Sequence, residues 1–96
     1  MIFPSHLIFR LHVTKRMFER NITESEIREV LHQGTVIRAY EDDQPYPSYL
    51  VYREVNARPL HIVAAINNEE NSTIIITAYE PNIFEWEEGF QNRRNP

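Results

Sequence analysis

Four β-rich runs follow one another in the second half of the chain, and they constrain its fold more than any other feature. They lie at residues 35–41, 48–55, 58–66 and 73–80 and are rich in β-branched and aromatic residues. Turn-forming residues separate them, because 42–47 carries two prolines and 67–72 is polar throughout. Since such short connections join antiparallel neighbours, the pattern predicts a four-stranded antiparallel meander.

A helix is predicted immediately before these runs, over residues 24–33. Thr23 and Glu26 have the spacing of a capping box, in which each side chain binds the other's backbone N–H. An apolar stripe at helical spacing follows, and Gly34 is expected to end the helix in the left-handed conformation.

Two further helices are expected at the ends of the chain. Apolar residues recur at roughly helical spacing over residues 5–20, although the stretch IFRLHV could also be a strand. Near the C-terminus, a short helix is predicted from the spacing of Ile83, Trp86, Glu87 and Phe90. The predicted fold is therefore α+β: two N-terminal helices, a four-stranded antiparallel sheet and a short C-terminal helix, in a single domain over residues 1–96.

The composition is that of an ordinary globular domain, with 42% hydrophobic and 25% charged residues. The formal charge of −4 argues against broad, sequence-independent binding to nucleic acid but is compatible with a localised cationic site. The absence of cysteine excludes disulfides, thiol nucleophiles and cysteine-ligated zinc, and fits a cytoplasmic location. Arg10 interrupts the apolar N-terminus far short of the roughly 20 residues of a membrane span, so no membrane association is expected.

Neither a metal nor another cofactor is expected. The chain has four histidines, and their spacing matches no zinc signature.

Strand alternation predicts which face of the sheet carries His61. In its own run, one face is formed by Leu60, Ile62, Ala64 and Ile66. In the next run, one face is formed by Ile74, Ile76 and Ala78, and the other by Thr73, Ile75, Thr77 and Tyr79. The purely aliphatic sets should pack beneath the helices. His61 is therefore expected on the helix-free face, near Thr77 or Tyr79.

His12, Arg16 and Arg20 are the first group that could carry chemistry. Their spacing of four residues would align them along one side of a helix. Two guanidinium groups beside an imidazole could grip a phosphate or carboxylate. The structural alternative is an ordinary surface ladder, or pairing of Arg16 with the acidic turn at 42–44.

Arg58 and His61 are the second group. An arginine can neutralise a phosphate while a histidine moves a proton near neutral pH. RNA cleavage needs no protein nucleophile, because the ribose 2′-OH attacks the adjacent phosphate. The structural alternative is a strand histidine bonded to Tyr79 or Thr77, with Arg58 satisfying a carboxylate.

Several segments together resemble the bacterial domain-of-unknown-function family 4258 (DUF4258). The likeness covers residues 12–93 and rests on the stretches HVTKRMFERNIT, LHQGTVIRAYEDDQPYPSYL, RPLHIVAA and IIITAYEPN and on the W-x-x-x-F-x-x-R pattern. The residues that carry it are His12, Arg16, Arg20, Gly34, Tyr40, Asp43, Pro45, Pro47, Arg58, Pro59, His61, Thr77, Tyr79, Pro81 and Trp86. The chain departs from the family pattern at Asn21, where glycine is expected, and at Arg53 and Glu54.

The resemblance implies an endoribonuclease-like toxin of a toxin–antitoxin pair, with RNA as substrate and an antitoxin protein as partner. The element order is also similar to the barnase–EndoU–colicin–RelE group of metal-independent ribonucleases. His61 would then be the general acid or base, Arg58 would stabilise the charge of the phosphorane, and Tyr79 would be an auxiliary donor.

The substrate-binding role falls in this interpretation to His12, Arg16 and Arg20, which would orient phosphate. A rival interpretation is a non-catalytic interaction domain that binds a partner protein through its sheet face or an edge strand. A third is a module that binds a small phosphorylated ligand.

Overall fold

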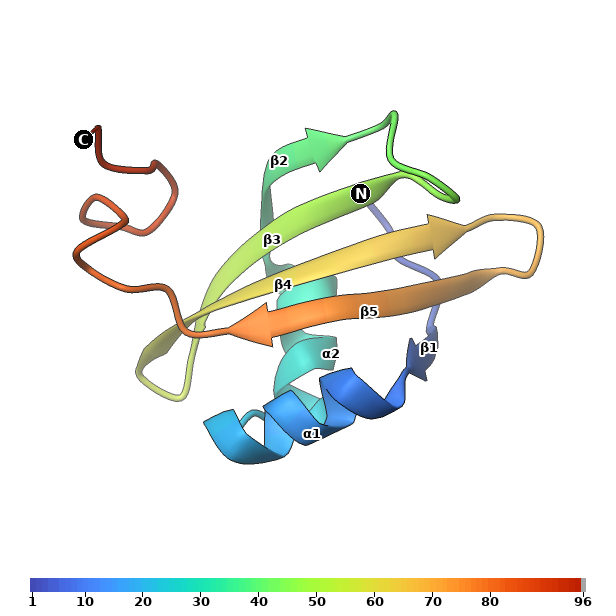
Figure 1. Cartoon of the computed structure of the whole chain (residues 1–96), viewed down its shortest axis with the longest axis horizontal. Helices are drawn as coiled ribbons and strands as arrows, with labels where there is room; N and C mark the ends of the chain where they lie inside the picture. The colour runs from blue at the N-terminus through green and yellow to red at the C-terminus, as the bar shows by residue number, and fades with distance from the viewer. Residues whose placement is uncertain (96) are drawn as a thin grey trace.

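A five-stranded sheet organises the computed structural model, which describes residues 1–95 (Figure 1). The strands are β1 His6–Phe9, β2 Thr35–Tyr40, β3 Ser48–Val55, β4 Arg58–Asn67 and β5 Ser72–Tyr79. Their order across the sheet is β1-β5-β4-β3-β2. Strands β2 to β5 form the expected antiparallel meander.

The helix predicted over residues 5–20 begins only at Leu11, and the first part of that segment instead forms strand β1, which makes the sheet mixed. This strand pairs in parallel with β5, so that Ile8 lies opposite Ile74. Leu7 and Phe9, two residues apart, both pack against the core, which is the spacing of a strand and not of a helix. The α+β class is right, but the four-stranded, wholly antiparallel sheet is wrong.

Two helices cover one face of the sheet: α1, Leu11–Arg20, and α2, Glu24–Gln33 (Figure 1). The capping box at the start of α2 is formed as predicted. Helix α1 ends at Arg20 and is capped by Asn21, whose φ of 55° is left-handed. This explains why a glycine is expected there, since asparagine is one of the few other residues that adopt this conformation readily. Within residues 1–95, no helix is long and apolar enough to cross a membrane.

Gly34 ends α2 for a different reason from the one predicted. Its backbone is extended, with φ −79° and ψ 176°, so the left-handed stop is wrong. A Cβ atom at this position would collide with the Val30 carbonyl oxygen and lie 2.8 Å from the Tyr52 carbonyl oxygen. Glycine is needed because the end of the helix passes directly over β3.

The core lies between the helices and one face of the sheet. The buried residues that α1, α2 and their connection supply are Val13, Met17, Ile22, Ile27, Val30 and Leu31. The sheet supplies Tyr49, Val51, Val55, Leu60, Ile62, Ala64, Ile66, Ile75 and Ala78. The predicted aliphatic set of β4 therefore does pack beneath the helices.

The face assignment in β5 is wrong over part of its length. The pairing register shifts between Val63 and Ala64 of β4, so that Val63 lies opposite Thr77 but Ala64 lies opposite Ile75. Such a bulge inserts one residue and reverses the alternation beyond it. Ile75 consequently joins the core, and Ile76 is exposed.

Residues 81–95, which we call the C-terminal clip, contain no helix. The clip folds back on itself: the Glu87 amide donates to the Asn92 carbonyl at 2.8 Å, and the Arg94 amide donates to the Glu85 carbonyl at 2.9 Å. The predicted C-terminal helix is therefore wrong. Trp86 is buried because it packs on the sheet, and its spacing to Phe90 reflects a turn.

Candidate functional site

His61 lies on the helix-free face of β4, as predicted, and forms the centre of a small aromatic cluster. It pairs across the sheet with Tyr52 of β3 and Tyr79 of β5. Its ring packs edge-on against both tyrosines, with centroid distances of 5.8 and 5.3 Å. We call the space bounded by these three side chains the His61 niche.

The C-terminal clip fills the His61 niche. The Trp86 ring stands edge-on to the imidazole at 4.5 Å between centroids, and the Phe90 ring lies 6.5 Å from that of Tyr52. The Arg93 guanidinium lies over the Trp86 ring at 5.2 Å. As a result His61 is 0% exposed, although no helix covers this face.

Both ring nitrogens of His61 have partners. Nε2 lies 2.8 Å from the Phe90 carbonyl oxygen, which can only accept, so Nε2 carries the hydrogen. Nδ1 lies 3.2 Å from the Tyr79 hydroxyl and accepts from it in the neutral ring. Burial lowers the pKa of His61, and the Arg93 charge lowers it further, while the bond to Phe90 acts in the opposite direction. The imidazole is therefore held neutral.

Tyr79 is held as a hydrogen-bond donor. Burial raises the pKa of its phenol, and the nearby Arg93 charge offsets only part of that effect. A neutral phenol beside a neutral imidazole forms a satisfied pair, but neither group is free to exchange a proton with a ligand while the clip is in place.

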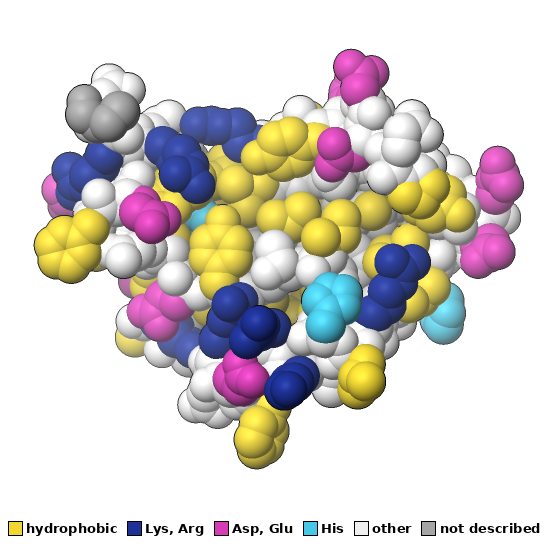
Figure 2. Space-filling model, in the orientation of Figure 1, with side chains coloured by type: hydrophobic (Ala, Val, Ile, Leu, Met, Phe, Trp, Pro, Cys, Tyr) yellow, Lys and Arg dark blue, Asp and Glu magenta, His cyan; other side chains and the backbone are white. Residues whose placement is uncertain are grey.

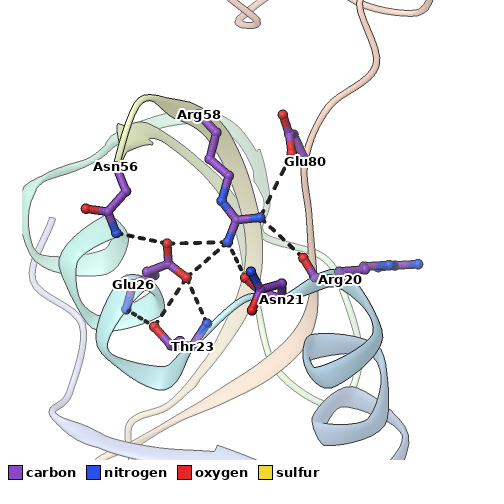
Figure 3. Close-up of polar contacts among 7 residues, drawn as sticks. All are labelled: Arg20, Asn21, Thr23, Glu26, Asn56, Arg58 and Glu80. Atoms are coloured by element: carbon purple, nitrogen blue, oxygen red, sulfur yellow. Dashed lines mark hydrogen bonds and ion pairs between the residues drawn. The ribbon is translucent and has the colours of Figure 1, made fainter.

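Arg58 lies on the other side of the sheet, among the ends of the two helices (Figure 3). Its Nη2 atom donates to both carboxylate oxygens of Glu26, at 3.1 and 3.3 Å, and to the carbonyl oxygen of Asn21. Its Nη1 atom donates to the Arg20 carbonyl oxygen at 3.2 Å and lies 4.0 Å from a Glu80 carboxylate oxygen. The guanidinium therefore ties β4 to the end of α1 and the start of α2.

Glu26 is the centre of this network, which we call the Arg58–Glu26 network. Burial alone would raise the pKa of its carboxyl, but the Thr23 backbone and side chain, the Asn56 amide and the Arg58 charge together lower it. The carboxylate accepts from the Thr23 amide at 2.9 Å and from Asn56 at 3.1 Å. The capping-box pattern predicted the bond between Glu26 and the Thr23 backbone, but no local sequence pattern indicates that Glu26 pairs with Arg58.

The three residues assigned to phosphate binding do not act together. His12 is exposed on α1. Arg16 is also exposed and pairs with Glu19 at 3.0 Å, and not with the acidic turn. Arg20 turns to the sheet, where its Nη1 atom donates to the Ala78 carbonyl oxygen at 2.8 Å. Across residues 1–95, no group of three potential metal-ligating side chains comes together.

The helix-free face has a distinct surface chemistry beyond the niche. Figure 2 shows an apolar band across the sheet with lysine and arginine side chains on both sides of it, and acidic side chains mainly toward the rim. The pairing registers align two cross-strand rows along this face. One row contains Arg38, Leu50, Val63 and Thr77, and the other contains Tyr40, Ser48, Ala65, Ile74 and Ile8.

These features define an α+β domain with one face of its sheet covered by helices and the other closed at one end by its own C-terminal segment. Residues 9–80 match the family described as Domain of unknown function (DUF4258), and the chain belongs to that family. The match includes β2 to β5 and both helices but ends before the C-terminal clip. Comparison with curated proteins and with solved structures found no match.

Proposed function

We propose that this chain is a non-catalytic interaction domain that binds a partner protein through the helix-free face of its sheet. One observation carries the proposal: the two residues best suited to acid–base and phosphate chemistry are separated by the sheet and used in the scaffold. Arg58 joins the helices through Glu26, and His61 is buried with both ring nitrogens bonded. The side chains that remain exposed on the helix-free face are suited to binding another protein.

The chemistry of that face supports a protein partner. Tyr40 and Ile76 are large apolar side chains that remain 42% and 41% exposed. Arg38 is exposed in the row that crosses the middle of the sheet. Aromatic and arginine side chains around an apolar centre are typical of protein interfaces. The flanking cations favour a partner that presents acidic residues around an apolar contact.

Site-specific photo-cross-linking in cells tests this proposal. A photoreactive phenylalanine analogue replaces Tyr40 on the helix-free face or, as a matched control, Phe18 on the outer side of α1, which is 88% exposed. We expect a discrete cross-linked protein from position 40 that is absent from position 18 and is lost when Arg38→Glu is added. Equal products from both positions, or none from position 40, would refute the proposal.

A second candidate is a metal-independent endoribonuclease, acting as the toxin of a bacterial toxin–antitoxin pair in the cytoplasm. It is favoured by the bonded His61–Tyr79 pair, which lies on the helix-free face within the family match, whereas the covering Trp86 lies outside the match. Growth arrest and RNA decay on induced expression, lost in His61→Ala and kept in His32→Ala, would support this candidate over the interaction domain. His32 is an exposed histidine of α2 and provides the matched control.

A further inference from the structure

We propose that the His61 niche is a binding site for a tryptophan-bearing peptide segment of a partner protein, and that the C-terminal clip is a displaceable internal occupant of that site. The inference rests on the proposed function and names the partner's chemistry and its regulation. Its starting point is that His61 is a fully buried histidine on a sheet face that carries no helix.

The present occupant defines the chemistry that the niche accepts. Trp86 supplies a planar ring that is 3% exposed and stands edge-on to the imidazole. The Phe90 backbone supplies the carbonyl oxygen that accepts the Nε2 hydrogen. A peptide segment supplies both groups, because an aromatic side chain can be followed a few residues later by a backbone carbonyl oxygen.

The C-terminal clip can detach without disturbing the sheet. It adds no strand to the sheet, and its backbone hydrogen bonds to Asn82, Glu85, Glu87 and Asn92 are all internal. Among residues 79–95, none belongs to the hydrophobic core cluster. In the part of the chain that the structure describes, the side-chain hydrogen bond between the clip and the niche is the one from His61 to the Phe90 carbonyl. A unit attached in this way can open locally while the core stays folded.

The flanks of the clip also point to a role beyond packing. Phe84 and Ile83 remain 82% and 57% exposed at its base, so the segment does not bury its own apolar residues efficiently. Phe90 has a positive φ of 57° and Gly89 one of 88°. A non-glycine residue in that region costs free energy, which lowers the stability of the closed clip relative to an open one.

The C-terminal clip and a partner peptide compete for the His61 niche. A tethered segment competes with a free one at an effective concentration on the order of millimolar. A partner peptide therefore binds the intact chain weakly unless it also contacts the helix-free face, because those contacts must compensate for competition by the clip. Binding of the partner and opening of the clip are then coupled, and the clip selects against short aromatic peptides that lack the additional contacts.

The test is a nuclear magnetic resonance titration that follows the His61 ring signals of the full chain. The probe is a synthetic peptide of residues 81–95, and the control peptide carries Trp86→Ala. We expect the Trp86→Ala chain to bind the probe with a saturable His61 shift and the wild-type chain to bind it roughly tenfold more weakly. Phe84→Ala, which alters an exposed clip aromatic, should behave as wild type.

Three outcomes of the titration would overturn the proposal. The first is a folded Trp86→Ala chain whose His61 signal the probe does not move. The second is equal binding by the wild-type and variant chains. The third is a His61 signal that a short single-stranded RNA moves but the peptide does not. Because the titration uses no cellular partner, its failure is distinguishable from failure of the cross-linking experiment.

Hydrogen exchange of the wild-type chain keeps the proposal testable if Trp86→Ala does not fold. The amides of Glu87 and Phe90, which donate within the clip, should exchange well before those of Ile62 and Ala64 in β4. Exchange of both sets only through global unfolding would show that the clip does not open by itself, and would refute the proposal.

Discussion

At the scale of single residues, Arg58 illustrates how a suspected catalytic group can be a structural one. Its side chain is 22% exposed, and its guanidinium binds Glu26 and two backbone carbonyl oxygens at the end of α1. Removing it would leave a mostly buried carboxylate without its counter-charge. We expect Arg58→Ala to lower the free energy of unfolding by about 2–3 kcal/mol, measured by urea denaturation.

The matched control for Arg58→Ala is Arg53→Ala. Arg53 also joins a strand to α2, through Glu29 at 3.4 Å, but both partners are more exposed. A surface pair of this kind contributes about 1 kcal/mol or less. Comparable losses in the two variants would contradict the scaffold role of Arg58.

His61 should make stability depend on pH. Because burial lowers the pKa of His61 below its ordinary value of 6.5, the imidazole binds a proton more tightly when the niche is open or the chain unfolded. The stabilisation is complete above pH 6.5 and is lost as the pH falls below it. We expect the melting temperature to fall between about pH 7 and pH 5.5, and to fall less in His61→Gln. A melting temperature that is flat in this range, or that falls equally in both proteins, would show that His61 is not the responsible group.

At the scale of elements, the junction between α2 and β2 depends on a glycine that must remain small. A Cβ at Gly34 would meet carbonyl oxygens of Val30 and Tyr52, which belong to backbone and cannot easily move. Gly34→Ala should therefore cost about 1–3 kcal/mol of unfolding free energy, whereas the exposed Ser25→Ala in α2 should change it by less than about 0.5 kcal/mol. Thermal or urea denaturation of the two variants is the measurement. No loss in Gly34→Ala would mean that the helix end relaxes freely.

The elements that could be predicted from the sequence are those fixed by local chemistry. The capping box of Thr23 and Glu26 lies within α2 itself, and the strands β2 to β5 are joined by short turns. Strand β1 pairs with β5, more than sixty residues away, as His6 opposite Ser72, and no local pattern encodes that partner. The bulge opposite Ala64 likewise depends on how two strands fit together.

The candidate site was predictable in part for the same reason. Strand alternation placed His61 on the correct face and beside Tyr79, because both facts follow from the period of a strand. The same alternation assigns Arg58 to the face of Leu60, and its partner Glu26 lies there. The cover formed by Trp86 could not be foreseen, since it requires a C-terminal turn that brings the indole onto the niche.

At the scale of the whole molecule, the chain divides into a sheet–helix body and the C-terminal clip. The core cluster includes residues from the N-terminal segment to Ala78 but none from the clip, and the family match ends at residue 80. The body therefore contains the hydrophobic core between the sheet and the helices. We expect a chain that ends after Pro81 to remain folded and to lose roughly 3 kcal/mol, because Trp86 no longer buries its indole.

Acylation of histidine by diethyl pyrocarbonate measures whether the C-terminal clip protects His61. In the full chain, the exposed His6, His12 and His32 should react quickly, while His61, which is 0% exposed, should be protected. In the chain that ends after Pro81, His61 should become a fourth reactive histidine, while circular dichroism reports an unchanged sheet. Rapid reaction of His61 in the full chain would show that the clip does not protect the niche. Loss of the sheet in the shortened chain would show instead that the clip is part of the folding unit, because the body would then depend on contacts outside its own core.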